Sequence, residues 1–208
     1  MNTITAHVEI HPEQLAGALS PATLAKALLE KLTASAEAGT ATKANTPPPL
    51  GAMWPEQGGI YAGVMRSEWG RHYHLIISPI DTELNDTEWG EDNKMISGAI
   101  NDRDGLSNSL AIRDYAKSIE KRFPAACLAL SLTANGFNDW YLPARHELRL
   151  AYLNTPEIFN LDGWYWTSTQ YAGYASTAWL QDFDNGDQDD FDKGFKGRVR
   201  AVRRFMID

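Results

Sequence analysis

The chain has 208 residues, of which 43% are hydrophobic and 22% are charged, and its formal net charge at pH 7 is −8. This composition is typical of a globular protein and excludes a disordered chain, and no apolar run reaches the roughly 18 residues of a membrane-spanning helix. The negative charge argues against nucleic acid as the main partner, although the segment RVRAVRR concentrates basic charge.

The cysteine count and the first residues bear on the compartment. The one cysteine, Cys127, excludes an internal disulfide and fits a reducing environment. The start, MNTITAHVEIHPEQ, has neither a basic leader nor an apolar stretch, so we expect no signal peptide. The predicted location is therefore cytoplasmic or virion-associated.

An N-terminal helix is predicted within a region that has no aromatic residue before position 50. Ser20 and Pro21 are typical of an N-cap and a first helical residue, and Leu24, Leu28 and Leu32 then recur at helical spacing. A lone helix of this length is marginal in water, so its leucine stripe must pack on something. We expect it to form a homo-oligomer or to dock on another protein, with packing on its own domain as the alternative.

A linker is predicted after this helix, because TATKANTPPPLG contains three consecutive prolines and reads as extended and semi-rigid chain. The predicted division is residues 1–47 for the helical segment and linker, and residues 48–208 for a globular domain.

The globular domain is predicted to begin with a β-hairpin, whose strands contain IYAGVM and YHLIIS. A polar stretch over 81–108 has the composition of a loop. A helix is predicted over SLAIRDYAKSIEKRF, with its apolar residues on one side. These residues are Ile112, Tyr115, Ala116, Ile119 and Phe123.

A second helix of this domain is predicted over LPARHELRLAYLN, with Pro143 in its first turn and Leu148, Ala151 and Tyr152 facing inward. Strands follow from Trp164 onward, with a hairpin turn at Asn185–Gly186 and a closing strand over RVRAVRRF. The order of hairpin, two helices and late strands predicts an α+β domain rather than an alternating parallel one.

Four motifs, GFNDWYLPARHELRLAYLN, YWTSTQY, AWLQDFDNG and RVRAVRRF, resemble in order and spacing the C-terminal domain family of collagen-like bacterial adhesins, over about residues 57–205. That family is common in bacterial surface proteins, phages and prophages. The resemblance implies a C-type-lectin-like fold, related to formylglycine-generating enzymes and to the variable proteins of diversity-generating retroelements. In that fold two helices flank a small twisted antiparallel sheet, and the termini lie close together.

The resemblance assigns most of the motif residues to structure. It implies that Trp140, Leu142 and Pro143 seat the second helix, and that a capping or ion-pair cluster surrounds the start of this helix. The cluster would consist of Asp139, Arg145 and Glu147. The implied core residues are Trp166, Trp179, Val199 and Val202.

Tyrosines and aspartates between these framework motifs are the predicted ligand-binding surface. Tyrosine combines a large contact area with few rotors, and the neighbouring glycine and serine residues lend adaptability. In the related variable proteins this same region displays the ligand-contacting residues. The predicted site consists of Tyr171, Tyr174, Gln181, Phe183, Asp184, Asn185, Asp187, Gln188 and Phe191. The alternative is a solvated, acidic hairpin with incidental rings.

Metal sites and catalytic motifs receive little support. When Gly186 is aligned with the glycine of an EF-hand loop, the first three ligand positions are occupied by Gln181, Phe183 and Asn185. A phenylalanine side chain cannot bind calcium, so the sequence does not match an EF-hand. The remaining alternative is a less regular calcium site among the aspartates. His72 and His74 share one strand face but have no third ligand in the sequence. Oxidation as in formylglycine-generating enzymes needs a pair of cysteines. We therefore expect no cofactor, no catalytic residue and no enzymatic activity.

The predicted function is a non-enzymatic module that binds a protein or glycan ligand, displayed multivalently by the N-terminal helix as in adhesion or phage-type recognition. One alternative is an intracellular, phage-encoded inhibitor whose Asp187, Asp189 and Asp190 imitate phosphates toward a basic host factor. Another is the variable protein of a diversity-generating retroelement. No membrane partner is expected.

Overall fold

The computed structural model describes residues 46–91 and 93–207. A boundary between two units of the chain falls between Thr46 and Pro47, and the domain discussed below is the second unit. The predicted N-terminal helix and its oligomer contacts lie outside the described residues. None of the helices in the described ranges has the length and apolar character needed to cross a membrane.

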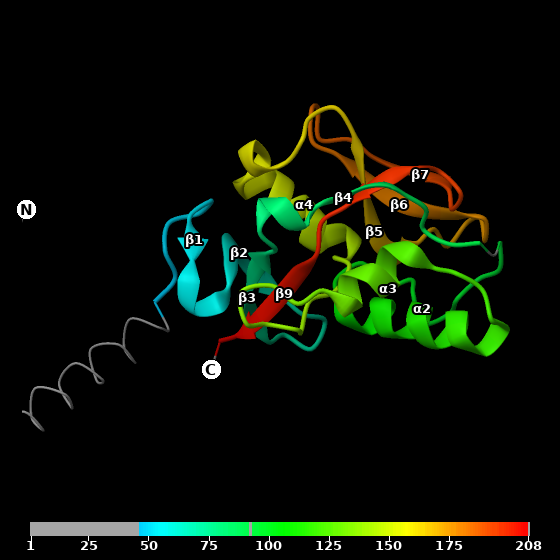
Figure 1. The fold of residues 1–208 in the computed structure, drawn as a ribbon, viewed down its shortest axis with the longest axis horizontal. Coiled ribbons are helices and arrows are strands. Elements are labelled where there is room, and N and C mark those ends of the chain that lie inside the picture. The colour runs from blue at the N-terminus through cyan, green and yellow to red at the C-terminus, as the bar shows by residue number, and fades with distance from the viewer. Residues whose placement is uncertain (1–45, 92, 208) are drawn as a thin grey trace, which may run out of the picture. The chain divides into compact units, whose positions relative to one another are not determined.

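The domain combines two sheets and three α-helices, so the predicted α+β class is confirmed (Figure 1). The first sheet has the order β1 (Met53–Trp54), β2 (Gly59–Arg66), β3 (His72–Ile77) and β9 (Val202–Met206). The second has the order β4 (Leu84–Thr87), β8 (Gly197–Val199), β5 (Trp164–Gln170), β6 (Thr177–Asp182) and β7 (Gln188–Asp192). The helices are α2 (Gly105–Ile119), α3 (Pro124–Ser131) and α4 (Arg145–Asn154), with short 3-10 turns η2 (Pro55–Gln57), η3 (Ile80–Thr82) and η4 (Pro156–Ile158).

The predicted first hairpin is confirmed as β2 and β3, which pair antiparallel. Side chains alternate along β3, because successive residues of a strand point to opposite faces. Tyr73, Leu75 and Ile77 are buried in the core beneath α4, whereas Ile76 belongs to the core that contains α2 and α3. β3 therefore contributes to both cores of the domain.

The first predicted helix begins and ends earlier than expected. Its N-cap is Asp104, whose carboxylate accepts hydrogen bonds from the amide and the hydroxyl of Ser107. The helix ends at Ile119, because Glu120 adopts a left-handed conformation with φ 54°. The sequence has no glycine there to signal that end.

A further helix, α3, replaces the end of that predicted helix, and Phe123 is its N-cap residue rather than part of α2. Figure 1 shows α2 and α3 side by side. The segment PAACLALS is too short and too uniformly apolar for helical periodicity to reveal it. Pro124 at its first position is the one helix signal present.

The predicted loop over 81–108 contains β4 and the beginning of α2, and it is fastened to β5 by two tryptophans. The Trp166 indole donates a hydrogen bond to the Thr87 carbonyl (2.8 Å). The Trp89 indole donates to the Thr167 carbonyl (2.8 Å). Both rings are almost fully buried. This polar stretch is therefore an integral part of the domain.

The predicted closing strand is two strands, β8 and β9, which lie in different sheets. The chain crosses between them at Arg200 and Ala201. The Arg200 guanidinium is buried, donates to the Ser78 carbonyl (3.0 Å) and pairs with Glu83 (3.0 Å). The apolar and basic alternation of RVRAVRRF indicates a strand but not the crossing. The predicted core residues Trp166, Val199 and Val202 are buried, as are Trp140 and Leu142, which were expected to seat the second helix.

Candidate functional site

The loop between β5 and β6, residues 171–176, carries the two tyrosines of the predicted site. Tyr174 is 67% exposed and Tyr171 is half-buried. The loop is closed at its base by hydrogen bonds from the Tyr171 amide to the Thr177 carbonyl and from the Thr177 amide to the Tyr174 carbonyl, both 3.2 Å. Tyr174 is therefore accessible to a ligand, and its role as a contact residue stays a prediction.

A buried glutamine holds this loop from below. The side-chain amide of Gln170 donates hydrogen bonds to the carbonyls of Ala175 (2.8 Å) and Lys94 (3.1 Å). Its oxygen accepts from the Ile96 amide (2.9 Å). Gln170 is only 1% exposed, so water competes little for these bonds. The tyrosine loop is thereby fixed to the segment that precedes α2.

The rings of Tyr174, Tyr171 and Trp179 form a continuous row. The ring centroids of Tyr171 and Tyr174 are 5.8 Å apart, and those of Tyr171 and Trp179 are 5.2 Å apart in an edge-to-face arrangement of 83°. A Cβ at Gly173 would lie 2.7 Å from the Tyr171 ring. Glycine at this position therefore allows the Tyr171 ring to lie over the loop backbone.

Arg145 and Gln188 extend the row of rings. The Arg145 guanidinium stacks over the Trp179 ring at 3.5 Å from its centroid. Its Nε donates to the Gln188 side-chain oxygen (2.9 Å), and the Gln188 amide donates to the Arg145 carbonyl (3.0 Å). We call the five residues Tyr171, Tyr174, Trp179, Arg145 and Gln188 the ring surface.

Trp179 corrects an expectation, because it is only partly buried and not a core residue. Its neighbours on β6, Ala178 and Leu180, are fully buried. Since side chains alternate along a strand, Trp179 lies on the opposite face. In the sequence TAWLQD, the position of Trp179 between two apolar residues of the same strand was the signal that it occupies the opposite face.

Arg145 was expected in a capping cluster with Asp139 and Glu147, and this cluster is wrong. Asp139 pairs instead with Arg203 on β9, at 2.7 and 2.9 Å. Of the three residues, Glu147 is the one that caps α4, because its carboxylate accepts from the Ala144 amide (2.8 Å). Arg145 is therefore free to stack on Trp179 and to belong to the ring surface.

Two predicted site residues, Gln181 and Phe183, are buried and cannot border a binding surface. Phe183 stacks on Phe159 with ring centroids 3.7 Å apart. The Gln181 amide donates to the carbonyls of Asp182 (2.7 Å) and Asp187 (3.1 Å) inside the hairpin. The prediction was wrong for this pair because it treated the hairpin as a free excursion, whereas the hairpin packs on the domain.

The turn of this hairpin leaves Asp184, Asn185 and Asp187 exposed, as predicted. The turn also lies against α4, because the Arg149 guanidinium donates a hydrogen bond to the Gly186 carbonyl. A Cβ at Gly186 would lie 2.5 Å from the Tyr152 ring. The aspartate turn is thus anchored on α4 and does not extend freely into solvent.

The residues of β7 divide between two faces. Gln188 and Asp190 pair with Gln181 and Trp179, and they share the face that carries the ring surface. Phe191 lies on the opposite face, where its ring contacts Trp164 at a centroid distance of 5.0 Å. Phe191 is thus separated from the predicted tyrosines. Asp189 and Asp190 likewise lie on opposite faces and do not form a single acidic surface.

The two histidines considered as metal ligands have different environments. His72 is exposed, whereas His74 is buried, with its Nδ1 3.2 Å from the Tyr61 hydroxyl. Burial lowers the pKa of His74. Within residues 46–91 and 93–207, no three His, Cys, Asp or Glu side chains are grouped as ligands of a metal ion.

The fold and the ring surface together define a small α+β domain with an ordered aromatic patch. The family model described as the Lcl C-terminal domain matches residues 83–203, which is more than half of the chain. The chain therefore belongs to this family. The match begins at residue 83, later than the expected start near residue 57.

Comparisons with individual proteins add a distant similarity. No curated protein matches the chain. Among solved structures, a fimbrial protein from Bacteroides ovatus ATCC 8483 is similar at a TM-score of 0.45 and 11% sequence identity. The similarity covers 65% of this chain and 36% of that protein.

Proposed function

We propose that this domain is a non-enzymatic recognition module that binds a protein or glycan ligand through the ring surface. The observation that carries this proposal is the exposed ring of Tyr174, at the end of a row of rings that is held on a buried base. Large aromatic side chains contribute most of the binding energy at many interfaces, and tyrosine and tryptophan are enriched there.

Order in the unbound protein favours this surface as a contact site. The hydrogen bonds of Gln170 fix the loop, and the stacked Arg145 fixes Trp179. Because these side chains lose little further freedom on binding, the entropic cost of association is reduced. Arg145, Gln188 and Asp190 add polar groups beside the rings, which suits the hydroxyls of a sugar or the backbone of a protein.

The C-type-lectin-like fold expected from the motifs is part of the same proposal. The strand order of the first sheet supports it, because β1 and β2 from the start of the domain share a sheet with β9 from its end. This arrangement brings the two ends of the domain to one sheet, as that fold does. Multivalent display by residues 1–45 would raise weak individual affinities.

The first test compares the ligands of the wild-type chain with those of Tyr174→Ala, on a glycan array and by capture from lysate. We expect Tyr174→Ala to lower the affinity for each confirmed ligand at least about tenfold, because it removes the most exposed ring of the row. The free energy of unfolding should change by less than about 0.5 kcal/mol, since the side chain is largely in solvent.

Trp69→Ala is the matched control. Trp69 is 86% exposed in the turn between β2 and β3, outside the ring surface. Its removal should leave ligand binding unchanged. Equal affinities of the wild type and Tyr174→Ala, or no ligand in either assay, would contradict the proposed function.

A further inference from the structure

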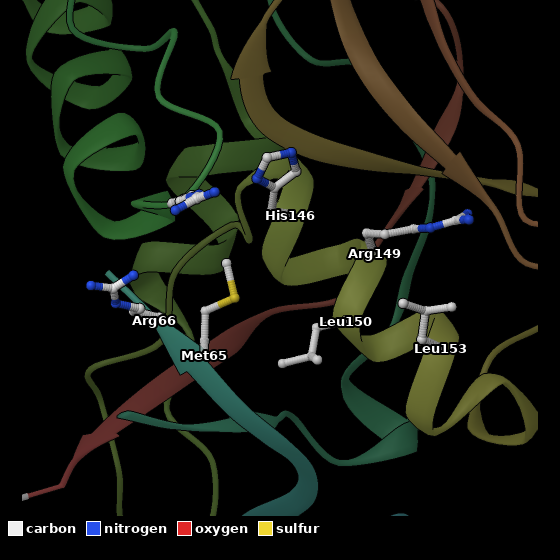
Figure 2. Close-up of a pocket in the computed structure, with 7 residues that line it drawn as sticks. Met65, Arg66, His146, Arg149, Leu150 and Leu153 are labelled. Atoms are coloured by element: carbon white, nitrogen blue, oxygen red, sulfur yellow. The ribbon is translucent and has the colours of Figure 1, made fainter. Parts of the chain in front are cut away.

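A groove separate from the ring surface lies between the end of β2 and α4, with a volume of about 410 Å³ (Figure 2). Figure 2 shows Met65 and Arg66 on the strand side and His146, Arg149, Leu150 and Leu153 along the helix. Arg103, from the segment before α2, completes the lining. The volume falls within the range of small ligand sites.

Positive charge is concentrated in this groove although the whole chain has a formal charge of −8. Arg66, Arg103 and Arg149 all line it, and no carboxylate does. In the part of the chain that the structure describes, the guanidinium groups of Arg66 and Arg103 form neither an ion pair nor a hydrogen bond. Two exposed cations are thus available to a ligand with negative charge.

The histidine in the groove adds little to this charge. Burial lowers the pKa of His146, with Asp102 acting in the opposite direction and the nearby Arg103 and Arg145 reinforcing the decrease. The imidazole is therefore neutral at pH 7, and the arginines supply the positive charge.

Apolar side chains form the rest of the lining. Met65 and Leu150 pack partly against the core beneath α4, and Leu153 is 62% exposed. A ligand that covered Leu153 would gain from burying apolar area, at roughly 25 cal/mol per Å². A purely charged chain would leave this area in water, so the lining favours a ligand with an apolar group between negative charges.

An unpaired strand edge borders the groove. β1 pairs only with Gly59 and Ile60 of β2, so the outer edge of β2 from Gly63 to Arg66 has no strand beside it among the described residues. Met65 and Arg66 are adjacent and point to opposite faces, which fits a groove that runs past this edge. An extended peptide can pair with such an edge through its backbone, which a polysaccharide cannot do.

We propose that this groove binds a short, extended segment of a partner protein in which carboxylate side chains flank an aliphatic or aromatic residue. The carboxylates pair with Arg66 and Arg103, and the apolar side chain covers Leu150 and Leu153. This site acts independently of the ring surface.

Selection from a displayed library of random twelve-residue peptides on the full-length protein tests the proposal. The enriched peptides should contain both acidic residues and a large apolar residue. Their affinity should fall at least tenfold for Arg66→Glu combined with Arg103→Glu, and three- to tenfold for Leu153→Ser. Both arginines are exposed, so a melting temperature within a few degrees of wild type should accompany the loss.

Arg113→Glu combined with Lys117→Glu is the control, because it makes the same change in net charge on α2 and should bind the peptides as the wild type does. Tyr174→Ala should also bind them normally, which separates this site from the proposed function. Enrichment that is equal on the Arg66/Arg103 variant, or no enrichment at all, overturns the proposal. Dextran sulfate binding that depends on the two arginines but not on Leu153 would identify a general polyanion site and also overturn it.

Discussion

Glu147 shows how a single buried residue holds several elements together. Its Oε1 accepts hydrogen bonds from the hydroxyls of Tyr73 (2.6 Å) and Tyr141 (2.8 Å), and its Oε2 accepts from the amides of Ala144 (2.8 Å) and Gly105 (3.2 Å). These donors belong to β3, to the starts of α2 and α4 and to the segment between α3 and α4. Glu147 is fully buried, so its removal leaves three donors without an acceptor, while the Tyr73 hydroxyl keeps the Arg103 carbonyl as an acceptor (3.2 Å).

We predict that Glu147→Ala lowers the free energy of unfolding by about 3 kcal/mol or more, because each unsatisfied buried donor costs about 1–3 kcal/mol. Urea denaturation monitored by tryptophan fluorescence measures this loss. Glu56→Ala, at an exposed glutamate, should change stability by less than about 0.5 kcal/mol. Equal stabilities of the two variants would show that the network contributes little.

The same residue predicts a pH dependence. Burial raises the pKa of Glu147 above the value of about 4.3 found in an unfolded chain. The folded state therefore binds this proton more tightly than the unfolded state. The stabilising contribution is complete below about pH 4 and is lost as the pH rises through the folded pKa.

Glu147→Gln removes this titration, so the stability of the wild type relative to Glu147→Gln should decrease between pH 4 and neutral pH. Denaturation curves of both proteins at four or five pH values measure the difference. A difference that increases with pH would mean that the four donors outweigh burial.

Individual surface residues were partly predictable from the sequence. Tyr171 and Tyr174 were identified from composition, because rings between small residues indicate an exposed loop. Trp179 was assigned to the wrong environment, since the hydrophobicity of a residue does not state which strand face it occupies. Gln181 shares the face of Trp179, and it was misplaced because the carbonyls of the hairpin enclose its side chain. Phe183 was misplaced because its partner Phe159 follows η4, whose packing under the hairpin depends on tertiary structure.

At the scale of elements, the hairpin β6–β7 is packed on α4 through its turn. Its turn is closed by the bond from the Asp182 amide to the Asp187 carbonyl (2.9 Å) and is seated on α4 through Gly186. Gly186 has a φ of 85° and its Cα lies against Tyr152. Both the conformation and the contact require glycine there.

We predict that Gly186→Ala is more destabilising than Gly136→Ala by at least about 1 kcal/mol, because a new Cβ must displace Tyr152. Gly136 is a matched control, since its φ of 84° is nearly the same and no other atom lies within 4 Å of the place that an alanine methyl group would take. Thermal unfolding of both variants gives the comparison. Equal losses would mean that backbone strain alone decides the effect.

Elements with strong periodicity or a definite turn signal were predicted well. α4 has inward residues at Leu148 and Ala151, and the Asn185–Gly186 turn joins β6 to β7 as expected. α3 was missed because its apolar residues surround the helix. The split of RVRAVRRF was missed because both halves alternate as strands, and the crossing is fixed by tertiary contacts of Arg200 and Ala201 with Ser78 and Glu83.

For the whole molecule, the boundary between Thr46 and Pro47 predicts that the domain after it folds independently. Residues 47–208 contain both sheets and both hydrophobic clusters, so they should unfold cooperatively without the preceding residues. Calorimetry of this fragment should give a melting temperature within about 2 °C of that of the same domain in the full chain.

Light scattering on the full chain and on the fragment tests the expected oligomer. If residues 1–46 carry the association, the full chain should be oligomeric and the fragment monomeric. A fragment that is unfolded, or as oligomeric as the full chain, would contradict this division of roles.

The crossing from β8 to β9 has a consequence for co-translational folding. Ten consecutive residues, 197–206, supply a strand to each sheet, and β9 pairs with β3, more than 120 positions earlier. Neither sheet can be completed before this segment leaves the exit tunnel. A nascent chain that stalls ahead of this segment therefore lacks one strand of each sheet.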